Sequence, residues 1–338
     1  MSPTTQIVFD TDIGTDIDDA LALTLALASP EIDVIGVTVV DGDVDTRAQI
    51  AARLLGLAGR PDIPVFKGRS TPLGPGHMPT WLGHEGQGLL DVPSVGQDAR
   101  IYEIPAADWL ISEAKQRSYH LVAVGPFSNV AVAVQKDPEF PQRVQHLTVM
   151  GGLVHPETLP APWHVFLQAN NLPPAAVDHN TASDVTAAAI VARAGFSMTW
   201  VTAEITFCTP LHRRHVQRIK DTQSAFGQAL ARMLNIWERQ VHHALLENPG
   251  YPNPVPPDSA AYLHDPLALS SLFESSTHWL VCKPHNLRFS GEGNLFHIRE
   301  EDTTTAEAIH SVSVSVDNTR FENFFLERVT GYLEQLPN

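Results

Sequence analysis

The segment that most restricts how this chain can fold is an apolar run at residues 7–9 that leads directly into a run of acidic residues. Five aspartates follow within ten residues: Asp10, Asp12, Asp16, Asp18 and Asp19. Carboxylates crowded at the end of a buried strand repel one another and are costly to desolvate. A fold retains such a group when a positive charge, usually a metal ion, lies between the carboxylates. The run therefore predicts a cation site.

The residue types indicate which cation. Carboxylates, with a backbone carbonyl as a further ligand, favour Ca²⁺ or Mg²⁺ over softer ions. An EF-hand is excluded, because that loop needs glycine at its sixth and glutamate at its twelfth position, and counting from Asp10 gives Thr15 and Leu21. A phosphotransfer enzyme with Asp10 or Asp12 as nucleophile stays an alternative, although Gly14 stands where such sites carry threonine or valine.

The amino-acid composition limits the classes of molecule that the chain is expected to bind. The chain has 338 residues, 43% of them hydrophobic, and a formal charge of -16, which is typical of a globular protein and argues against nucleic acid or an anionic membrane as a partner. No Walker-type loop or strand-linked Gly-x-Gly-x-x-Gly is present, so an uncharged substrate is favoured over a nucleotide. Two cysteines are too few for a disulfide framework, and no apolar run of about 18 residues occurs, so we expect a cytoplasmic, unanchored protein.

Short β-branched runs alternate with helical periodicity, which predicts an α/β fold: an open, mostly parallel sheet with a Rossmann-like core flanked by helices. No linker divides the chain, so we predict one domain over residues 1–338. A proline-rich loop or lid is predicted at 248–257 and a mobile flap at 153–177. Predicted strands cover 7–9, 34–40, 64–66, 121–124, 146–150, 197–201 and 312–316, and predicted helices cover 19–28, 46–57, 106–115, 129–135, 184–194 and 224–246, with further helices from about 265 and 320.

Polar clusters follow several of these strands, at 10–19, 41–43, 125–129 and 150–152. The carboxyl ends of the strands in an open parallel sheet face one crevice, so these clusters are expected to meet in an active site. Taken singly, the clusters at 41–43 and 150–152 are more often ordinary turns. Five aspartates exceed what a helix cap needs.

The histidines divide into groups. His264 and Asp265 begin a predicted helix behind the proline-rich loop, where the histidine can exchange protons and the aspartate can reach a metal, although such a pair alone is more often a cap. His84 lies in a glycine-rich loop and either touches a ligand or belongs to a solvated turn. Four others are interpreted as surface or packing residues, with a zinc site as the less favoured alternative: His212, His215, His242 and His243.

Together, these motifs resemble those of the nucleoside hydrolase superfamily, of the inosine-uridine-preferring type. The resemblance spans most of the chain, and its most specific parts are the opening aspartate motif and the His-Asp-Pro-Leu-Ala element at 264–268. The other matching segments are 36–38, 125–129, 150–152, 178–180 and 316–321.

The resemblance implies Ca²⁺-dependent hydrolysis of the N-glycosidic bond of ribonucleosides to free base and ribose. Asp12 would bridge the metal and act as general base on a metal-bound water, and His264 would protonate the leaving base. The implied metal ligands are Asp10, Asp12, Asp19, Asp265 and the backbone carbonyl of Ser128. The implied substrate-binding residues are Asp18, Asp43, Asp178, Asn180 and His84. A homodimer or homotetramer is also implied.

The chain departs from the common family pattern at several positions. Ile13 replaces a proline, and two extra residues, with an added Asp16, precede Asp18 and Asp19. Asp43 stands where asparagine is usual and Asp178 where glutamate is common. A non-catalytic homologue that binds Ca²⁺ and a nucleoside therefore stays an alternative, and the preferred base stays open.

Overall fold

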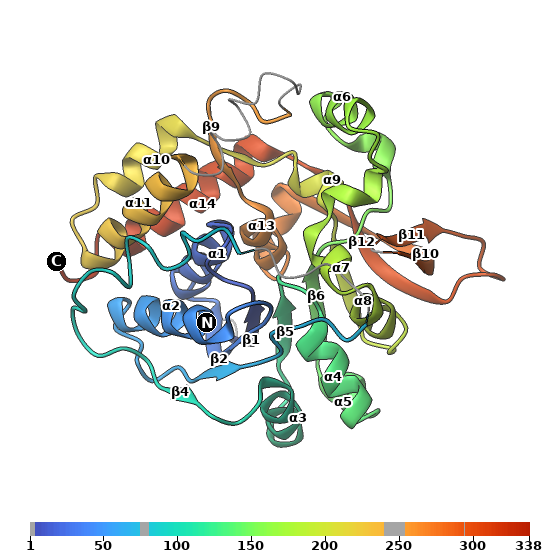
Figure 1. The fold of residues 1–338 in the computed structure, drawn as a ribbon, viewed down its shortest axis with the longest axis horizontal. Helices are drawn as coiled ribbons and strands as arrows, with labels where there is room; N and C mark the ends of the chain where they lie inside the picture. Colours follow the sequence, from blue (N-terminus) through green and yellow to red (C-terminus); the bar gives the residue numbers. More distant parts are fainter. Residues whose placement is uncertain (1–3, 75–80, 240–253, 294) are drawn as a thin grey trace.

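The computed structural model describes residues 4–74, 81–239, 254–293 and 295–338. Among them, one ten-stranded sheet runs in the order β11-β10-β12-β7-β6-β5-β1-β2-β3-β4 (Figure 1). The pairs from β4 to β12 are parallel, whereas β10 is antiparallel to both of its neighbours. The strands are β1 Thr5–Thr11, β2 Ile32–Val39, β3 Val65–Lys67, β4 Ile101–Tyr102, β5 His120–Ala123, β6 His146–Met150, β7 Met198–Val201, β10 Leu280–Glu292, β11 Leu295–Glu300 and β12 Ala308–Val316. The predicted α/β fold with a mostly parallel sheet is confirmed.

Helices cover both faces of the sheet. On one face, α1, α2, α11, α13 and α14 contribute to a single hydrophobic cluster, and on the other face α3, α4 and α8 contribute to a second one. Successive residues of β1 alternate between the two, with Ile7 and Phe9 in the first and Val8 in the second, as the two-residue repeat of a strand requires. The longer helices are α1 Asp18–Leu27, α2 Val44–Leu57, α3 Ala106–Gln116, α4 Ser128–Lys136, α6 Ala161–Ala169, α8 Val185–Ala192, α10 Arg213–Lys220, α11 Ala225–Trp237, α13 His264–Ser270 and α14 Asn318–Leu333.

Short elements complete the description. A small two-stranded sheet pairs β8 with β9, and β9 leads into α13. The short elements are α5 Phe140–Arg143, η1 Pro156–Thr158, η2 Pro174–Val177, α7 His179–Ser183, α9 Ala203–Thr206, β8 Pro210–His212, β9 Ser259–Tyr262 and η4 Glu274–His278.

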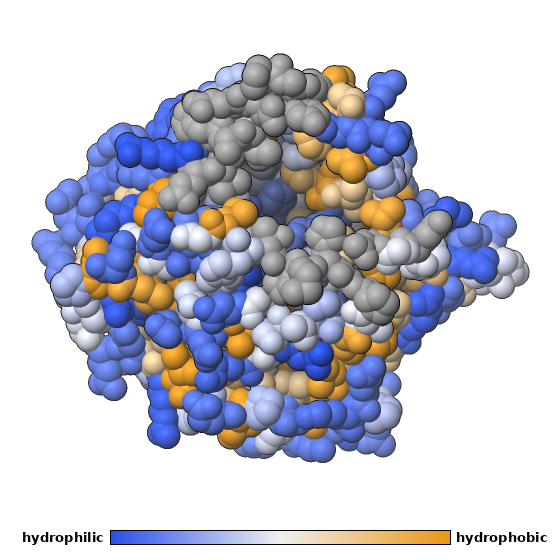
Figure 2. Space-filling model, viewed as in Figure 1, coloured by the Kyte–Doolittle hydropathy of each residue, from blue (hydrophilic) through white to orange (hydrophobic). Residues whose placement is uncertain are grey.

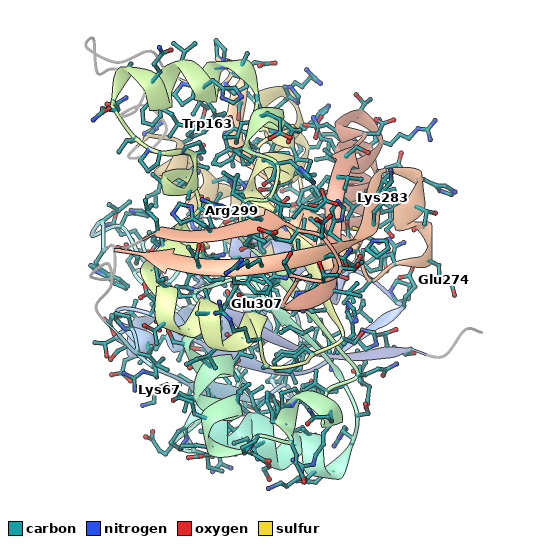
Figure 3. The ribbon with its side chains drawn as sticks, turned by 90° about the vertical axis from the view of Figure 1, so that its right-hand side faces the viewer. Lys67, Trp163, Glu274, Lys283, Arg299 and Glu307 are labelled. Atoms are coloured by element: carbon teal, nitrogen blue, oxygen red, sulfur yellow. The ribbon has the colours of Figure 1, made fainter. Side chains whose placement is uncertain are left out.

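The structure adds elements that the sequence patterns did not predict. The expected flap at 153–177 contains η1, α6 and η2, and a long β10–β11 hairpin extends the sheet beyond β12. Figure 3 shows this hairpin crossing one side of the molecule, with Trp163 of α6 above it. The predicted helix at 224–246 is present as α11 as far as Trp237, and residues 240–253, with His242, His243 and part of the proline-rich stretch, lie outside the described residues. No helix in the described part of the chain is long and apolar enough to cross a bilayer.

Candidate active site

A cavity of about 330 Å³ opens at the carboxyl ends of the central strands. Two sets of side chains line it. The carboxylate cluster consists of Asp12, Asp16, Asp18, Asp19 and Asp265, and the aromatic cluster consists of Trp163, Phe207, Tyr262 and His264. Figure 2 shows a hollow in this face of the molecule, with hydrophobic surface on its α6 side.

The loop between β1 and α1 is held by a buried arginine from α2. Arg47 is 1% exposed, and its guanidinium donates to the carbonyl oxygens of Asp12 and Ile13 and, at 2.6 Å, to that of Asp41. It also donates to the Thr15 hydroxyl at 3.2 Å. The carbonyl groups of an irregular buried loop need such donors, since no strand pairs with them. Arg47 therefore shapes the loop that carries the first carboxylates.

Three carboxylates meet where the N-termini of α1 and α13 approach each other. Asp18 and Asp19 lie in the first turn of α1, Asp265 lies in the first turn of α13, and one oxygen of each lies within 4.8 Å of the others. The Asp265 amide donates to Asp18 Oδ2 at 3.3 Å, and the Thr11 hydroxyl donates to Asp19. The positive ends of both helix dipoles favour negative charge here, but a dipole end counts for about half a unit charge and cannot balance three carboxylates.

Burial raises the pKa of these groups, and each carboxylate raises the pKa of its neighbours further. The pKa values of Asp18, Asp19 and Asp265 all lie well above the usual range, because of burial first and neighbouring aspartates second. Burial also raises the pKa of Asp16, which shares the cavity, to about 7. A divalent cation bound among these oxygens would reverse both effects, and an all-oxygen donor set fits Ca²⁺ or Mg²⁺. The donor set therefore fits the predicted ion.

Asp12 projects from the end of β1 into the same cavity. It is 8% exposed, and its Oδ2 lies 3.9 Å from Nε2 of His179, a residue of α7 that also lines the cavity. Gly125 passes close to this carboxylate, since a Cβ on Gly125 would come within 2.8 Å of both Asp12 N and Asp12 Oδ1. Glycine at 125 is thus required for Asp12 to take this position.

Asn180 lines the cavity beside the ends of β5 and β6. Its side-chain amide donates to the carbonyl oxygen of Val124 at 2.6 Å and to that of Met150 at 3.1 Å. Both of its amide hydrogens therefore bind backbone, which leaves the Asn180 side-chain carbonyl oxygen to accept from a ligand. Asp178 lies behind it, where it accepts from the Gly152 amide at 2.8 Å, and burial raises its pKa.

The aromatic cluster joins three segments far apart in the sequence. Trp163 of α6 packs on Phe207 with ring centroids 4.1 Å apart, and Phe207 contacts Tyr262 at 5.3 Å. The His264 ring lies 4.8 Å from Phe207, and its Nδ1 is 2.7 Å from the Thr206 hydroxyl. Burial lowers the pKa of His264 to about 3, so the ring is neutral at pH 7. Flat apolar rings of this kind suit a planar heterocycle.

The eleven predicted site residues do not all meet at the cavity surface. Asp12, Asp18, Asp19, Asn180, His264 and Asp265 line the cavity, as expected. Asp10 lies behind Asp12, fully buried, and accepts from Thr38 and, at 2.7 Å, from Asn129, while its second oxygen has no hydrogen-bond partner among the described residues. Burial raises the pKa of Asp10 to about 7.

Three residues that were expected to contact the substrate or the metal do not line the cavity. Asp43 is exposed and caps α2, where it accepts from the amides of Asp45 and Thr46 at 3.1 Å, because the first turn of a helix leaves such amides unpaired. His84 is buried outside the cavity, with Nε2 2.9 Å from the Thr15 carbonyl oxygen. Ser128 begins α4 and donates to Asp184 at 2.6 Å, and Val124, rather than Ser128, lines the cavity.

Sequence reasoning missed several residues that shape or line the cavity. Arg47 had a recognisable signal, since Arg47, Ile50, Ala51 and Leu54 form the buried stripe of α2 and an arginine in such a stripe needs buried partners. His179 stands between Asp178 and Asn180, within a matched segment, and its side chain reaches Asp12. Trp163, Phe207 and Tyr262 had no local signal, because only tertiary packing brings their rings together.

The fold and this cavity define an α/β enzyme with a carboxylate-rich site, and comparison with known proteins gives its family. The family model described as "Inosine-uridine preferring nucleoside hydrolase" matches residues 7–323, so the chain belongs to this family. As a member, it is a hydrolase that acts on N-glycosyl bonds, and the acidic site agrees with the metal dependence of the family.

Named relatives and solved structures cover almost the whole chain. A probable uridine nucleosidase 2 of Arabidopsis thaliana is 28% identical over 96% of this chain and 97% of its own length. The pyrimidine-specific ribonucleoside hydrolase RihA of Citrobacter koseri is 26% identical over 96% and 98%. Among solved structures, a purine-preferring ribonucleoside hydrolase from Gardnerella vaginalis superposes with a TM-score of 0.79 at 25% identity, covering 98% of this chain and 99% of that one.

Proposed function

We propose that the protein hydrolyses the N-glycosidic bond of ribonucleosides to free base and ribose, in a reaction that depends on Ca²⁺. The observation that carries the proposal is a single cavity lined by both a carboxylate cluster and an aromatic cluster. Carboxylates with a cation suit a polar, hydroxyl-rich sugar, and stacked rings suit a planar base. The names of the relatives, which include pyrimidine-specific and purine-preferring enzymes, support this substrate class and leave the base open.

The ion would be held by Asp12, Asp18, Asp19 and Asp265, with Asp10 in support behind Asp12. When bound, Ca²⁺ supplies positive charge that orients ribose hydroxyls and lowers the pKa of a nearby water molecule. In this proposal the backbone carbonyl ligand is assigned to Val124 instead of Ser128, because Val124 lines the cavity.

Asp12 would remove the proton from the attacking water at the anomeric carbon. The bond to the base breaks through an oxocarbenium-like state, and the surrounding carboxylates stabilise its positive charge electrostatically. Asp18 and the free side-chain oxygen of Asn180 would accept hydrogen bonds from ribose hydroxyls, and His179 would approach the sugar from beside Asp12. These roles place every general-base and sugar contact in the carboxylate part of the cavity.

His264 would assist the departure of the base, and its ring is neutral before substrate binds, since burial holds its pKa near 3. The Thr206 hydroxyl donates to the Ala203 carbonyl oxygen at 3.2 Å, so Nδ1 of His264 carries the ring hydrogen and donates to Thr206. To act as a general acid, the ring would take up a second proton at Nε2 and pass it to the departing base. This general-acid role follows from the position of the ring in the aromatic cluster.

A panel assay tests the proposal. The full chain is incubated with purine and pyrimidine ribonucleosides and with 2′-deoxyribonucleosides, with and without a Ca²⁺ chelator, and free base and reducing sugar are measured. We expect base release from ribonucleosides that disappears on chelation and in Asp12→Ala. Nucleoside binding without base release would instead support a non-catalytic binding protein, and full activity after metal removal would contradict the mechanism. A homodimer or homotetramer and a cytoplasmic location remain predictions.

A further inference from the structure

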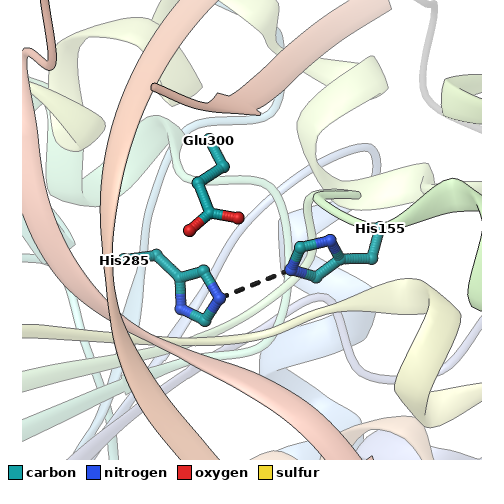
Figure 4. A group of neighbouring side chains, drawn as sticks. All are labelled: His155, His285 and Glu300. Carbon is teal, nitrogen blue, oxygen red and sulfur yellow. Dashed lines mark hydrogen bonds between the residues drawn. The ribbon is translucent and has the colours of Figure 1, made fainter. Parts of the chain in front are cut away.

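A second group of potential metal ligands lies outside the cavity and differs from the carboxylate cluster in chemistry. His155 follows β6, His285 lies in β10, and Glu300 ends β11. One ligand atom of each lies within 4.8 Å of the others. Figure 4 shows the two imidazole rings facing one another, with the Glu300 carboxylate directed into the same space. None of the three residues lines the cavity.

The two imidazole rings approach each other through their Nε2 atoms. Nε2 of His155 and Nε2 of His285 are 3.4 Å apart. Nδ1 of His285 lies 2.9 Å from the carbonyl oxygen of Lys283, and a carbonyl oxygen can only accept, so this Nδ1 carries the ring hydrogen. A neutral His285 therefore directs the lone pair of Nε2 toward His155. Metal-binding histidines are typically oriented in this way, by donating the other ring N–H to a carbonyl or carboxylate.

His155 is held in place by contacts with two glutamates. The backbone amide of His155 donates to Glu204 at 2.9 Å, and its Nδ1 faces the Glu157 carboxylate at 3.6 Å. Zinc-to-nitrogen bonds of about 2.0–2.1 Å in a tetrahedral site place two nitrogens roughly 3.3–3.4 Å apart. The 3.4 Å separation of the two Nε2 atoms matches this spacing.

We propose that His155, His285 and Glu300 form a binding site for a borderline transition-metal ion of the Zn²⁺ type, separate from the oxygen-ligand site in the cavity. Two imidazole nitrogens and one carboxylate are a zinc ligand set that leaves a fourth position for water. Such nitrogen ligands discriminate against Ca²⁺, which prefers oxygen. The ion would join the segment after β6 to the β10–β11 hairpin.

A second group of two histidines and one glutamate lies elsewhere in the structure, and its hydrogen bonding differs. His212, His215 and Glu322 also lie within reach of one ion. There, however, Glu322 Oε1 lies 2.9 Å and 2.7 Å from the two Nδ1 atoms, and it accepts from the His212 amide. A hydrogen bond with His212 and an ion-pair contact with His215 occupy the Glu322 carboxylate there, whereas two facing ring nitrogens have a single hydrogen at most to share.

Calorimetric titration of the untagged full chain with ZnCl₂, in saturating Ca²⁺ so that the cavity is occupied, tests the site. We expect Zn²⁺ binding to the wild type that weakens at least about tenfold in His155→Gln and in His285→Gln, as loss of a metal ligand requires. His297→Gln, which changes a histidine in β11 outside the group, is the matched control and should bind as the wild type does. Because Glu300 is exposed at a strand end, Glu300→Gln keeps the test valid if a histidine variant does not fold.

Co²⁺ provides a second measurement, since intense visible bands report tetrahedral coordination. These bands should appear in the wild type and in His297→Gln, and they should be lost in His285→Gln. Absence of Zn²⁺ binding in the wild type, or equal affinity in wild type and His285→Gln, would overturn the proposal and leave a simple hydrogen bond between the rings. Binding that is lost only in His215→Gln would also overturn it, by placing the ion at the other group. None of these outcomes depends on nucleoside hydrolysis.

Discussion

The carboxylate cluster and the aromatic cluster line the same cavity but are built in different ways. Four of the five carboxylates come from one continuous segment after β1, and the fifth begins α13. The rings of Trp163, Phe207 and Tyr262 come from α6, the end of α9 and β9, which are separated by tens of residues, and His264 begins α13 two residues after Tyr262. A local motif can therefore fix the chemistry of the reaction, while the surroundings of the base depend on how distant segments pack. The predictions below test this division.

Replacing Asp12 should have the largest effect, because it removes the group proposed to accept the proton. In Asp12→Ala we expect kcat to fall by roughly 10³-fold, within the range typical of general-base loss, with the fold retained. Steady-state release of free base measures kcat, and circular dichroism checks folding. A kcat within about tenfold of the wild type would show that another group takes the proton.

Metal removal should change how stability depends on pH. Burial raises the pKa of Asp10 and Asp16 to about 7 and that of Asp41 to about 6, from the ordinary aspartate value of 3.8. Between these values the folded chain holds protons that the unfolded chain has released, so the stability of the chelated protein falls as pH rises from about 4 to 7. We expect the unfolding temperature to drop by roughly 5 °C or more over this interval.

The control for this experiment is the same titration with Ca²⁺ present. A bound cation favours the ionised carboxylates, so the loss of stability near pH 7 should largely disappear. An unfolding temperature that is independent of Ca²⁺ across the whole interval would contradict a metal site in the carboxylate cluster. Differential scanning calorimetry provides both measurements.

Replacing Trp163 should alter binding more than chemistry. Its indole packs on Phe207 in the aromatic cluster, and loss of an aromatic contact is worth about 0.5–1.5 kcal/mol, so in Trp163→Ala we expect KM to rise about 3- to 10-fold with little change in kcat. Val165 is half exposed on the same helix, and Val165→Ala is the matched control. A fall in kcat as large as that in Asp12→Ala would contradict the proposed division, in which the carboxylate cluster serves the reaction and the aromatic cluster binds the base.

The same division explains what the sequence could predict. The alternation of strands and helices, and the site residues at strand ends and helix starts such as Asp12 and Asp265, follow from patterns within a few residues of each position. Asn180 was implied by the family resemblance alone. The β10–β11 hairpin was missed because its alternation is weak in sequence, and α6 was taken for a flap because prolines flank it. His84 was misplaced for another reason: its loop approaches the site, but Leu82 lines the cavity while His84 turns toward Thr15.

The smallest effect is expected at Asp43, where the family resemblance and the structure differ. The resemblance implies a ribose contact, whereas the structure shows an exposed cap of α2 that also accepts from the Thr46 hydroxyl at 2.7 Å. Asp43→Ala should therefore leave kcat and KM unchanged and lower the free energy of unfolding by about 1 kcal/mol, as typical for loss of an N-cap. Asp43→Ser, which can still cap the helix, should recover most of that stability. If kcat/KM instead falls more than about tenfold in both variants while stability is unaffected, Asp43 contacts the sugar during the reaction, and the N-terminus of α2 belongs to the carboxylate part of the site.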